Sequence, residues 1–276
     1  GYPIARIAAK LAVAYDLSEL NISVTKSTNS SFQFKHDHVA EKYPRWPFDK
    51  FTTADRKLGT QMKATGEVMA LHRSFEGGVQ KAVDSLELKT IGLQLSSLKN
   101  KTIPELWGKL AEKSDERIFV IFEMLRKGVT IEEIHEATVI DYFFLKSFAS
   151  LIQSEMEIEA KAIDQVTREE LQSYKEKGFS DRYLASVWKV NEMEVRAHRK
   201  SLGVTAVYKT VDTCAAEFES HTNYHYSTYF GENEQQKTDK KKVLMIGSGP
   251  IRNGQGIEFD YCSVHGVYAL QDENVE

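Results

Sequence analysis

Cysteine is scarce in this chain. Only two cysteines occur among 276 residues, Cys214 and Cys262, and neither belongs to a CxxC pair or to a Cys/His ligand pattern. This excludes a disulfide framework and a structural zinc site of the usual spacing. Because cysteine is among the residue types most often buried, we expect both to be small buried apolar residues.

Long apolar runs and an excess of positive charge are also missing. No stretch of about eighteen apolar residues and no signal-like start occur, so we expect no membrane span and a cytoplasmic location. The net charge of -4 at pH 7 argues against nucleic acid or an anionic membrane as the main partner. A hydrophobic fraction of 41% still provides for a packed core.

The middle of the chain, residues 89–202, is predicted to be all helical. It contains one proline, Pro104, and no sustained alternation of apolar and polar residues. Helix starts recur instead: Thr130 and Thr167 each precede a glutamate by three positions, as in a capping box, and Asp141 precedes a long amphipathic stretch. These signals predict a mainly α fold.

Two further helical stretches are expected before this middle region. Apolar spacing over 4–14 predicts a thin, alanine-rich helix, and its abrupt start suggests that the chain begins inside a longer protein. Apolar residues over 67–71 and 75–86 predict a strong helix, which Gly77 and Gly78 would weaken by about 1 kcal/mol each relative to alanine. A break in that helix, with Ser74 capping a second one, is the alternative.

Two local patterns invite a ligand interpretation. His36, Asp37 and His38 are adjacent, but without a metal-binding spacing we expect exposed loop residues and no metal. Residues 180–200 resemble a helix-turn-helix, with four basic or imidazole side chains on the second helix: Arg196, His198, Arg199 and Lys200. A nucleic-acid-binding protein is therefore the alternative hypothesis. Against it, Glu192 and Glu194 would stand where bases are normally read.

Residues 241–262 predict a strand, a glycine-rich turn and a helix. Four apolar residues, 243–246, precede four glycines within ten positions. Such a unit opens many nucleotide-binding α/β domains. The stretch lacks both the GxGxxG spacing and a Walker lysine, so we expect no phosphate cradle of either kind.

Several separated motifs, in register, resemble the large subunit of carbamoyl phosphate synthetase. They are Gly1–Ala5, Pro44–Trp46, Asp55–Leu58, Thr60–Ala70, Val211–Phe218, Tyr226–Tyr229 and Gly254–Cys262. The resemblance covers the whole chain, although the helical middle is recognised mainly by its position.

The resemblance implies a division into three parts. Residues 1–88 would be the C-terminal part of the first, carboxyphosphate-forming ATP-grasp half. Residues 89–234 would be the helical oligomerisation domain, and 235–276 the pre-ATP-grasp start of the second, carbamoyl phosphate-forming half. The expected fold is thus mainly α, with partial α/β segments on either side.

The resemblance also implies a function for the parent protein. The full enzyme forms carbamoyl phosphate for pyrimidine and arginine biosynthesis, using ATP with Mg or Mn, and works with a glutaminase small subunit. The residues that bind nucleotide and metal would precede Gly1 or follow Glu276. We therefore expect this chain to bind no cofactor, to contain no catalytic residue and to be inactive alone, while supplying scaffold and homo-oligomer contacts.

Four residues can be assigned provisional roles. By resemblance, Glu258 lines the internal passage for carbamate in the intact enzyme; from its position alone it is a first-turn helix residue stabilised by the helix dipole. In the long amphipathic stretch, Phe143, Phe144 and Phe148 are candidates for an interface with another copy. Such an apolar stripe also fits a core face.

The chain departs from the family pattern in two places. Asn253 stands where an apolar residue usually precedes Gly-Gln-Gly, and residues 32–43 lack the family's Glu-Pro pair and consecutive β-branched residues. These departures predict a weakened strand before Pro44 and raise the question of whether the parent enzyme is fully active.

Overall fold

The computed structural model describes residues 4–21, 29–31, 35–88, 90–212, 224–235, 238–246, 251–252 and 257–276; of 251, 252 and 257–260 it describes the backbone alone. Within these residues the helices are α1 (Ile4–Leu11), α2 (Phe75–Ser85), α3 (Ser96–Lys99), α4 (Ile103–Ala111), α5 (Arg117–Arg126), α6 (Ile131–Thr138), α7 (Tyr142–Glu159), α8 (Arg168–Glu176), α9 (Asp181–Trp188), α10 (Glu192–Ser201) and α11 (Ile257–Asp272). The strands are β1 (Val39–Arg45), β2 (Gly66–His72), β3 (Val207–Thr210), β4 (His225–Thr228) and β5 (Ile251–Arg252), and two short 3-10 turns are η1 (Leu17–Glu19) and η2 (Ile163–Gln165). The prediction of a mainly α chain is confirmed.

A three-stranded antiparallel sheet, ordered β1-β2-β5, joins the two ends of the chain. In the β1–β2 pair, Val39 lies opposite His72 and Arg45 opposite Gly66. The departures at 32–43 put the strand before Pro44 in doubt, but a strand does form there, because β1 pairs with β2 along its whole length; residues 32–34 lie outside the described residues. β5 adds to the other edge of β2, with Ile251 opposite Glu67.

The helix predicted over 67–71 is wrong, since these residues form β2. Val68 and Ala70 are buried while Glu67 and Met69 are exposed, which is the two-residue period of a strand with one face on a core. The predicted cap at Ser74 is confirmed: its side chain accepts a hydrogen bond from the backbone N–H of Gly77.

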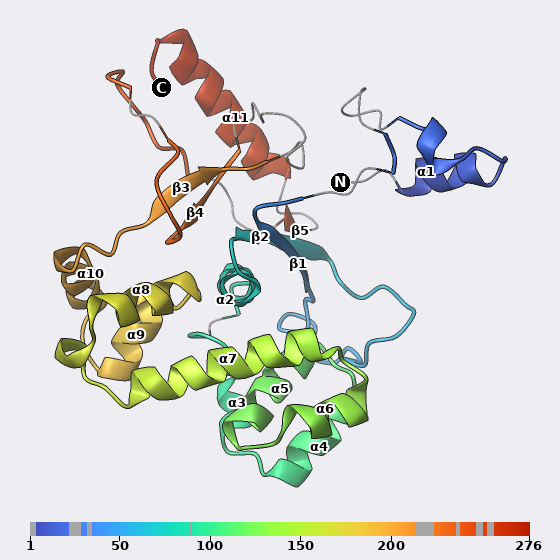
Figure 1. Ribbon diagram of the computed structural model, residues 1–276, viewed down its shortest axis with the longest axis vertical. Coiled ribbons are helices and arrows are strands. Elements are labelled where there is room, and N and C mark those ends of the chain that lie inside the picture. The colour runs from blue at the N-terminus through green and yellow to red at the C-terminus, as the bar shows by residue number, and fades with distance from the viewer. Residues whose placement is uncertain are drawn as a thin grey trace.

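Helix α2 lies between the sheet and the larger helical unit (Figure 1). Ala82 and Leu86 pack toward the sheet with Val68 and Ala70, whereas Val79 and Val83 belong to the core of the helical unit. The alternative of a break at Gly77 and Gly78 does not hold, because α2 runs unbroken from Phe75 to Ser85. Both glycines are buried, and their lack of a side chain lets the sheet approach closely.

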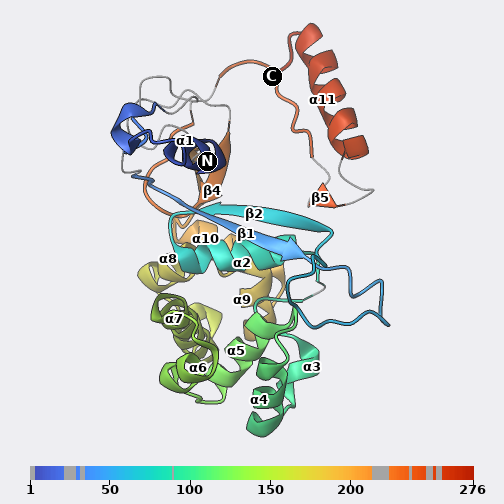
Figure 2. The same ribbon diagram turned by 90° about the vertical axis from the view of Figure 1, so that its right-hand side faces the viewer.

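Helices α3 to α10 form one packed unit; α3 to α7 and α9 lie below the sheet in both views, and α8 and α10 lie at about the level of α2 (Figure 2). Its core is a single cluster that includes Leu106 of α4, Phe122 of α5, Leu151 of α7, Leu171 of α8 and Val195 of α10, each fully or almost fully buried. The capping boxes predicted at Thr130 and Thr167 are confirmed, as is the helix start at Asp141. In each case the side chain of the cap residue accepts a hydrogen bond from a first-turn backbone N–H that has no partner within the helix, and this fixes where the helix begins.

Outside the unit formed by α3 to α10, the apolar side chains are less completely buried. The stripe predicted for the first helix is largely exposed, with Ile7 buried but Ile4 71% and Leu11 40% exposed. Residues 243–246 form no strand; their described backbone pairing is Val243 N–H to the carbonyl of Glu276, at 2.8 Å. A short apolar run becomes a strand only where neighbouring strands can pair with it, so this prediction is wrong here.

Candidate functional site

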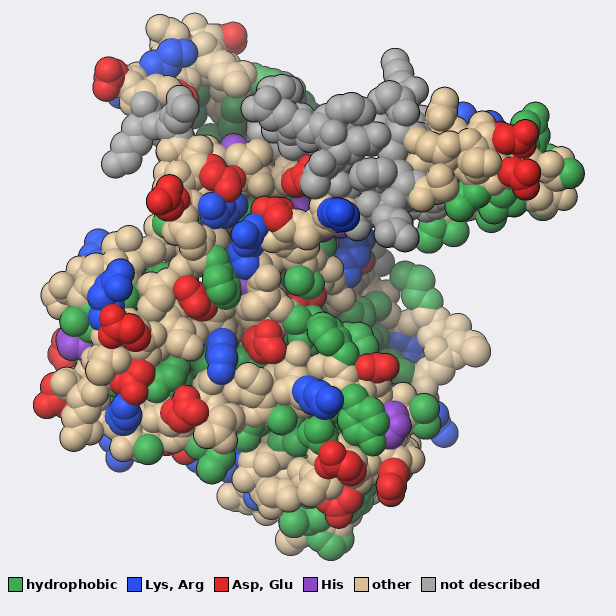
Figure 3. Space-filling view, in the orientation of Figure 1, with side chains coloured by type: hydrophobic (Ala, Val, Ile, Leu, Met, Phe, Trp, Pro, Cys, Tyr) green, Lys and Arg blue, Asp and Glu red, His purple; other side chains and the backbone are tan. Residues whose placement is uncertain are grey.

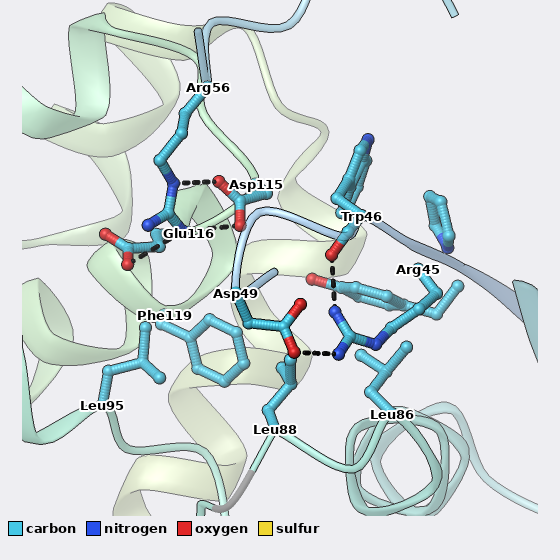
Figure 4. A pocket seen from close by; sticks show the side chains of 12 residues that line it. Arg45, Trp46, Asp49, Arg56, Leu86, Leu88, Leu95, Asp115, Glu116 and Phe119 are labelled. Atoms are coloured by element: carbon cyan, nitrogen blue, oxygen red, sulfur yellow. Dashed lines mark hydrogen bonds and ion pairs between the residues drawn. The ribbon is translucent and has the colours of Figure 1, made fainter. Parts of the chain in front are cut away.

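A charge-lined pocket of about 210 Å³ lies where the Pro44-Arg45-Trp46 motif meets the start of α5 (Figure 4). In the view, the charged groups of Arg56 and Arg45 lie above a row of apolar side chains: Leu95, Phe119, Leu88 and Leu86. The pocket thus joins a polar rim to an apolar floor, at the contact between the sheet and the helical unit.

Two arginines close the polar side of this pocket. Arg56 donates to both carboxylate oxygens of Asp115, at 2.9 and 2.7 Å, and its guanidinium lies 3.1 Å from the carboxylate of Glu116. The hydrogen bond from Arg56 to Asp115 raises the pKa of the Arg56 guanidinium above its usual range. Because residues 56 and 115 are far apart in sequence, this bidentate pair fixes the loop after β1 to the helical unit.

Arg45 is the second of these arginines and is 5% exposed. It donates to the carbonyl of Trp46 and, at 2.8 Å, to the carboxylate of Asp49, and this hydrogen bond lowers the pKa of Asp49. Its Nε is buried without a hydrogen-bond partner. Each carboxylate lining the pocket is paired with an arginine, so among the described residues the pocket offers no free carboxylate as a general base.

The Tyr226–Tyr229 motif lies in and just after β4, which pairs with β3 in a separate two-stranded sheet, and it contacts both α2 and the helical unit. Lys81 of α2 donates from Nζ to the carbonyls of Leu71 and Ser227, at 3.0 and 2.8 Å. The same ammonium lies 5.9 Å from the centre of the Tyr226 ring. The sequence marks this motif as a family signature but does not reveal its partner Lys81, because no local pattern relates a residue at 81 to one at 227.

The ring of Tyr229 is contacted by two cations from the helical unit. Lys175 Nζ lies 5.1 Å and the Arg199 guanidinium 5.5 Å from its centre. Cations at such distances are attracted by the negative face of an aromatic ring. Gln172 of α8 also donates to the Tyr229 carbonyl. This motif is therefore held by side chains from α2, α8 and α10.

Arg199, one of the four residues behind the nucleic-acid hypothesis, is 7% exposed. It donates to Asp181 of the preceding helix, the shortest contact being 2.8 Å from Nη2, and to the Val204 carbonyl at 2.9 Å. Burial alone would raise the pKa of Asp181, but hydrogen bonds from Arg199 and the charge of Lys175 lower it instead. A guanidinium used in this way cannot also bind a phosphate, and Arg196 and Lys200 remain on the exposed face.

The three candidate interface phenylalanines fall into two environments. Phe148 is 6% exposed and packs on Phe122, with ring centres 4.8 Å apart, so it belongs to the core. Phe143 and Phe144 are 57% and 41% exposed. Hydrophobic side chains gather on the surface where the start of α7 adjoins α6 (Figure 3). An interface at Phe143 and Phe144 stays a prediction.

Three other sequence predictions have clear outcomes or lie outside the description. The backbone of Glu258 is in the first turn of α11, while its side chain is not among the described atoms. Cys262 is exposed, so its predicted burial is wrong, and Cys214 lies outside the described residues. His36 and Asp37 are exposed loop residues, as predicted, but the side chain of His38 is only 7% exposed and lies 3.1 Å from the Asp37 carboxylate, so the predicted exposure is wrong for His38. Within the described ranges no group of three metal-ligating side chains is found.

No helix in the described part of the chain is both long and apolar enough to cross a membrane.

Comparison with known proteins decides the family. Residues 67–203 match the family model for the carbamoyl-phosphate synthetase large chain, oligomerisation domain, and 239–276 match that for the carbamoyl phosphate synthase preATP-grasp domain. The whole chain is 57% identical to a carbamoyl phosphate synthase arginine-specific large chain of Halalkalibacterium halodurans. The chain belongs to the carbamoyl phosphate synthetase large-chain family.

Two other arginine-specific large chains are similar over the full length of this chain. That of Geobacillus stearothermophilus is 57% identical and that of Bacillus subtilis 53% identical. The chain spans about a quarter of the length of these curated relatives, 27% in each case. Its match to the large-chain family therefore includes the charge-lined pocket and the Tyr226–Tyr229 motif, together with the helical unit between them.

Proposed function

We propose that this chain is the association and scaffold region of the large subunit of a carbamoyl phosphate synthetase, an ATP-dependent carbon-nitrogen ligase. The observation that carries the proposal is 57% identity, over all of this chain, to large chains named for that activity. The name "arginine-specific" of these relatives favours carbamoyl phosphate made for arginine; the same product also serves pyrimidine synthesis.

The proposed division of labour follows the three parts of the chain. Residues 1–88 would close the first ATP-grasp half, 89–234 would form the oligomerisation domain, and 235–276 would open the second half. The family-model match at 239–276 supports the last part, and the match at 67–203 supports an oligomerisation domain over most of the middle part, although this match already begins within the first part. The backbone pairing of Glu67 with Ile251 supports a direct contact between the first part and the last.

In this proposal the chain positions catalytic parts rather than performing catalysis. ATP, with Mg or Mn, would be held by other parts of the large subunit, and a glutaminase small subunit would supply ammonia in the cytoplasm. Glu258 would line the passage for carbamate between the two halves. Of the chain's own polar contacts, Arg56–Asp115 would hold the loop after β1 against the helical unit, and Lys81 would join α2 to β2 and β4 through the carbonyls of Leu71 and Ser227.

The test is production of carbamoyl phosphate by the complete protein that carries this chain. The protein is expressed with its glutaminase partner and supplied with bicarbonate, glutamine, ATP and Mg. We expect carbamoyl phosphate, trapped as citrulline by added ornithine and transcarbamylase. Ammonia in place of glutamine should support the reaction without the partner. Failure with both nitrogen donors, by a folded protein, would contradict the proposal.

A matched pair of variants tests the scaffold role. Arg56→Gln removes the bidentate contact with Asp115, whereas Lys200→Gln alters an exposed cation on α10. We expect Arg56→Gln to lower synthesis of carbamoyl phosphate while leaving the glutaminase reaction of the partner measurable. Lys200→Gln should change neither. Equal synthesis by both variants would show that this contact does not position catalytic parts.

A further inference from the structure

A second hollow, of about 560 Å³, lies between the sheet and the helical unit. It shares Tyr43, Pro44 and Trp46 with the charge-lined pocket but extends toward α7. Its other walls come from the loop at Leu58, from the start of α5 and from α7. A molecule bound there would contact both parts of the fold at once.

The walls of this hollow are mostly apolar. Ile118 and Ile121 of α5, Ile140, and the rings of Phe144 and Phe148 line one part of it, and Trp46 lines another. Phe144 is 41% exposed, so the hollow is open to solvent on that side. Concave apolar walls of this size suit the hydrocarbon or aromatic body of a small ligand.

The charges around the hollow do not balance. The ammonium of Lys42 is paired with Glu67 at 2.8 Å, and the carboxylate of Asp115 is occupied by Arg56. The two remaining cations, Lys113 and Arg117, form no ion pair with any described carboxylate within 4.0 Å.

Arg117 also has an unmet hydrogen-bonding need. Its Nε is buried and donates to no described acceptor. A buried donor without a partner costs free energy, but an anion in the hollow would meet the Nη groups of the half-buried Arg117 and not this inaccessible Nε. Beside an apolar wall, a guanidinium favours a planar carboxylate or a phosphate, to which it can donate more than one hydrogen bond.

We propose that this hollow binds a small amphipathic anion: one carboxylate or phosphate group carried on an alkyl or aromatic body. Arg117 and Lys113 receive the anionic group, and Trp46, Ile118 and Phe144 cover the body. Because the walls belong to both the sheet and the helical unit, the ligand stabilises their contact and raises the melting temperature of the protein. The proposal does not depend on the catalytic function proposed above.

Calorimetric titration of the complete protein that carries this chain tests the site. The probes are octanoate, octyl phosphate and the uncharged octanamide. We expect saturable one-to-one binding of the anions and at least about tenfold weaker binding of octanamide, a difference of about 1.4 kcal/mol. Preference for octanoate or for octyl phosphate distinguishes a carboxylate ligand from a phosphate ligand.

Three variants separate loss of the site from loss of the fold. Arg117→Gln should weaken both anions at least about tenfold and leave octanamide unchanged. Arg117→Lys retains the charge and should bind the anions more tightly than Arg117→Gln. Lys200→Gln, on the exposed face of α10, should bind like the unaltered protein. Circular dichroism establishes that each variant is folded.

Several results would overturn the proposal. These are the absence of saturable binding, equal affinity for octanoate and octanamide, and octanoate binding that Arg117→Gln leaves unchanged. Binding by the 276-residue chain but not by the complete protein would also overturn it, because another segment would then occupy the hollow.

Discussion

The imidazole of His72 occupies the space where a side chain on Gly77 would begin. A Cβ added to Gly77 would lie 2.1 Å from Cε1 of His72, which is far closer than any real contact. His72 is 4% exposed and its Nδ1 accepts a hydrogen bond from the backbone of Ser74, at 3.2 Å, so the ring has little freedom to move. The glycine is thus a requirement of helix–sheet packing, and its unfavourable helix propensity is offset by that packing.

Replacing Gly77 by alanine is therefore expected to destabilise the fold. Overpacking should lower the free energy of unfolding by about 1–3 kcal/mol, measured by urea unfolding of the 276-residue chain. Gly108→Ala in α4 is the matched control, because nothing lies within 4 Å of its added Cβ. It should stabilise the chain by about 0.5–1 kcal/mol through helix propensity alone. Equal effects of the two substitutions would contradict the packing argument.

His72 is also expected to make the fold sensitive to acid. Burial, together with the charge of Lys81, lowers its pKa from 6.5 to about 4. Between these values the unfolded chain binds a proton that the folded chain does not, so stability falls as the pH falls from about 6.5 to 4, by at most about 3 kcal/mol. In His72→Gln this part of the decline should be absent from urea unfolding measured at several pH values. If the free energy of unfolding falls with pH in the same way in both proteins, His72 is not the source of the acid sensitivity.

Glu41 is expected to have the opposite effect on the pH dependence of stability, destabilising the fold as the pH rises. Burial, with the nearby charge of Glu76, raises its pKa from 4.5 to about 8, and its Oε1 is buried without a partner. From about pH 4.5 to 8 the folded chain holds a proton that the unfolded chain has released, so stability falls as the pH rises. Glu41→Gln should flatten this part of the profile, and Glu136→Gln, an exposed residue of α6, should not.

The helical middle could be predicted because its signals are local. Thr102, Thr130 and Thr167 each stand three positions before a glutamate, and all three form capping boxes. A helix end depends on backbone groups within one turn, so sequence spacing is sufficient to locate it. The pairing of β5 with the edge of β2, and the hollow between the sheet and the helical unit, depend instead on contacts between residues far apart in the sequence.

The errors arose where distant parts of the chain decide the outcome. Residues 66–72 are short and apolar enough to suit either a helix or a strand, and pairing with β1 and β5 makes them a strand. The basic pattern at 196–200 gives no sign that Arg199 is buried against Asp181, which is eighteen residues earlier on another helix. The family motifs were more informative, since they indicated the family without requiring any long-range geometry to be derived.

The Arg199–Asp181 pair leads to a prediction that separates a structural role from nucleic-acid binding. Arg199→Ala leaves a buried carboxylate partly uncompensated and should lower the free energy of unfolding by about 3 kcal/mol. Arg196→Ala, on the exposed face of α10, should change it by less than about 0.5 kcal/mol.

Retention on a DNA column should be negligible for the unaltered chain at low salt. Strong retention that Arg196→Ala abolishes would restore the nucleic-acid hypothesis.

Association of the helical unit is expected to depend on Phe143. Its ring is 57% exposed and lies 5.4 Å from that of Phe75, so removing it should cost the monomer little, whereas a second copy covering it would bury an aromatic side chain. Phe143→Ser should therefore lower the mass measured by light scattering across a concentration series, with the circular dichroism spectrum unchanged. Met193→Ser, which replaces a 65% exposed residue on α10, is the control and should retain the mass of the unaltered protein. If Phe143→Ser has the same mass as the unaltered protein at every concentration, the interface lies elsewhere, because an aromatic ring buried between two copies contributes too much to association for its loss to go unnoticed.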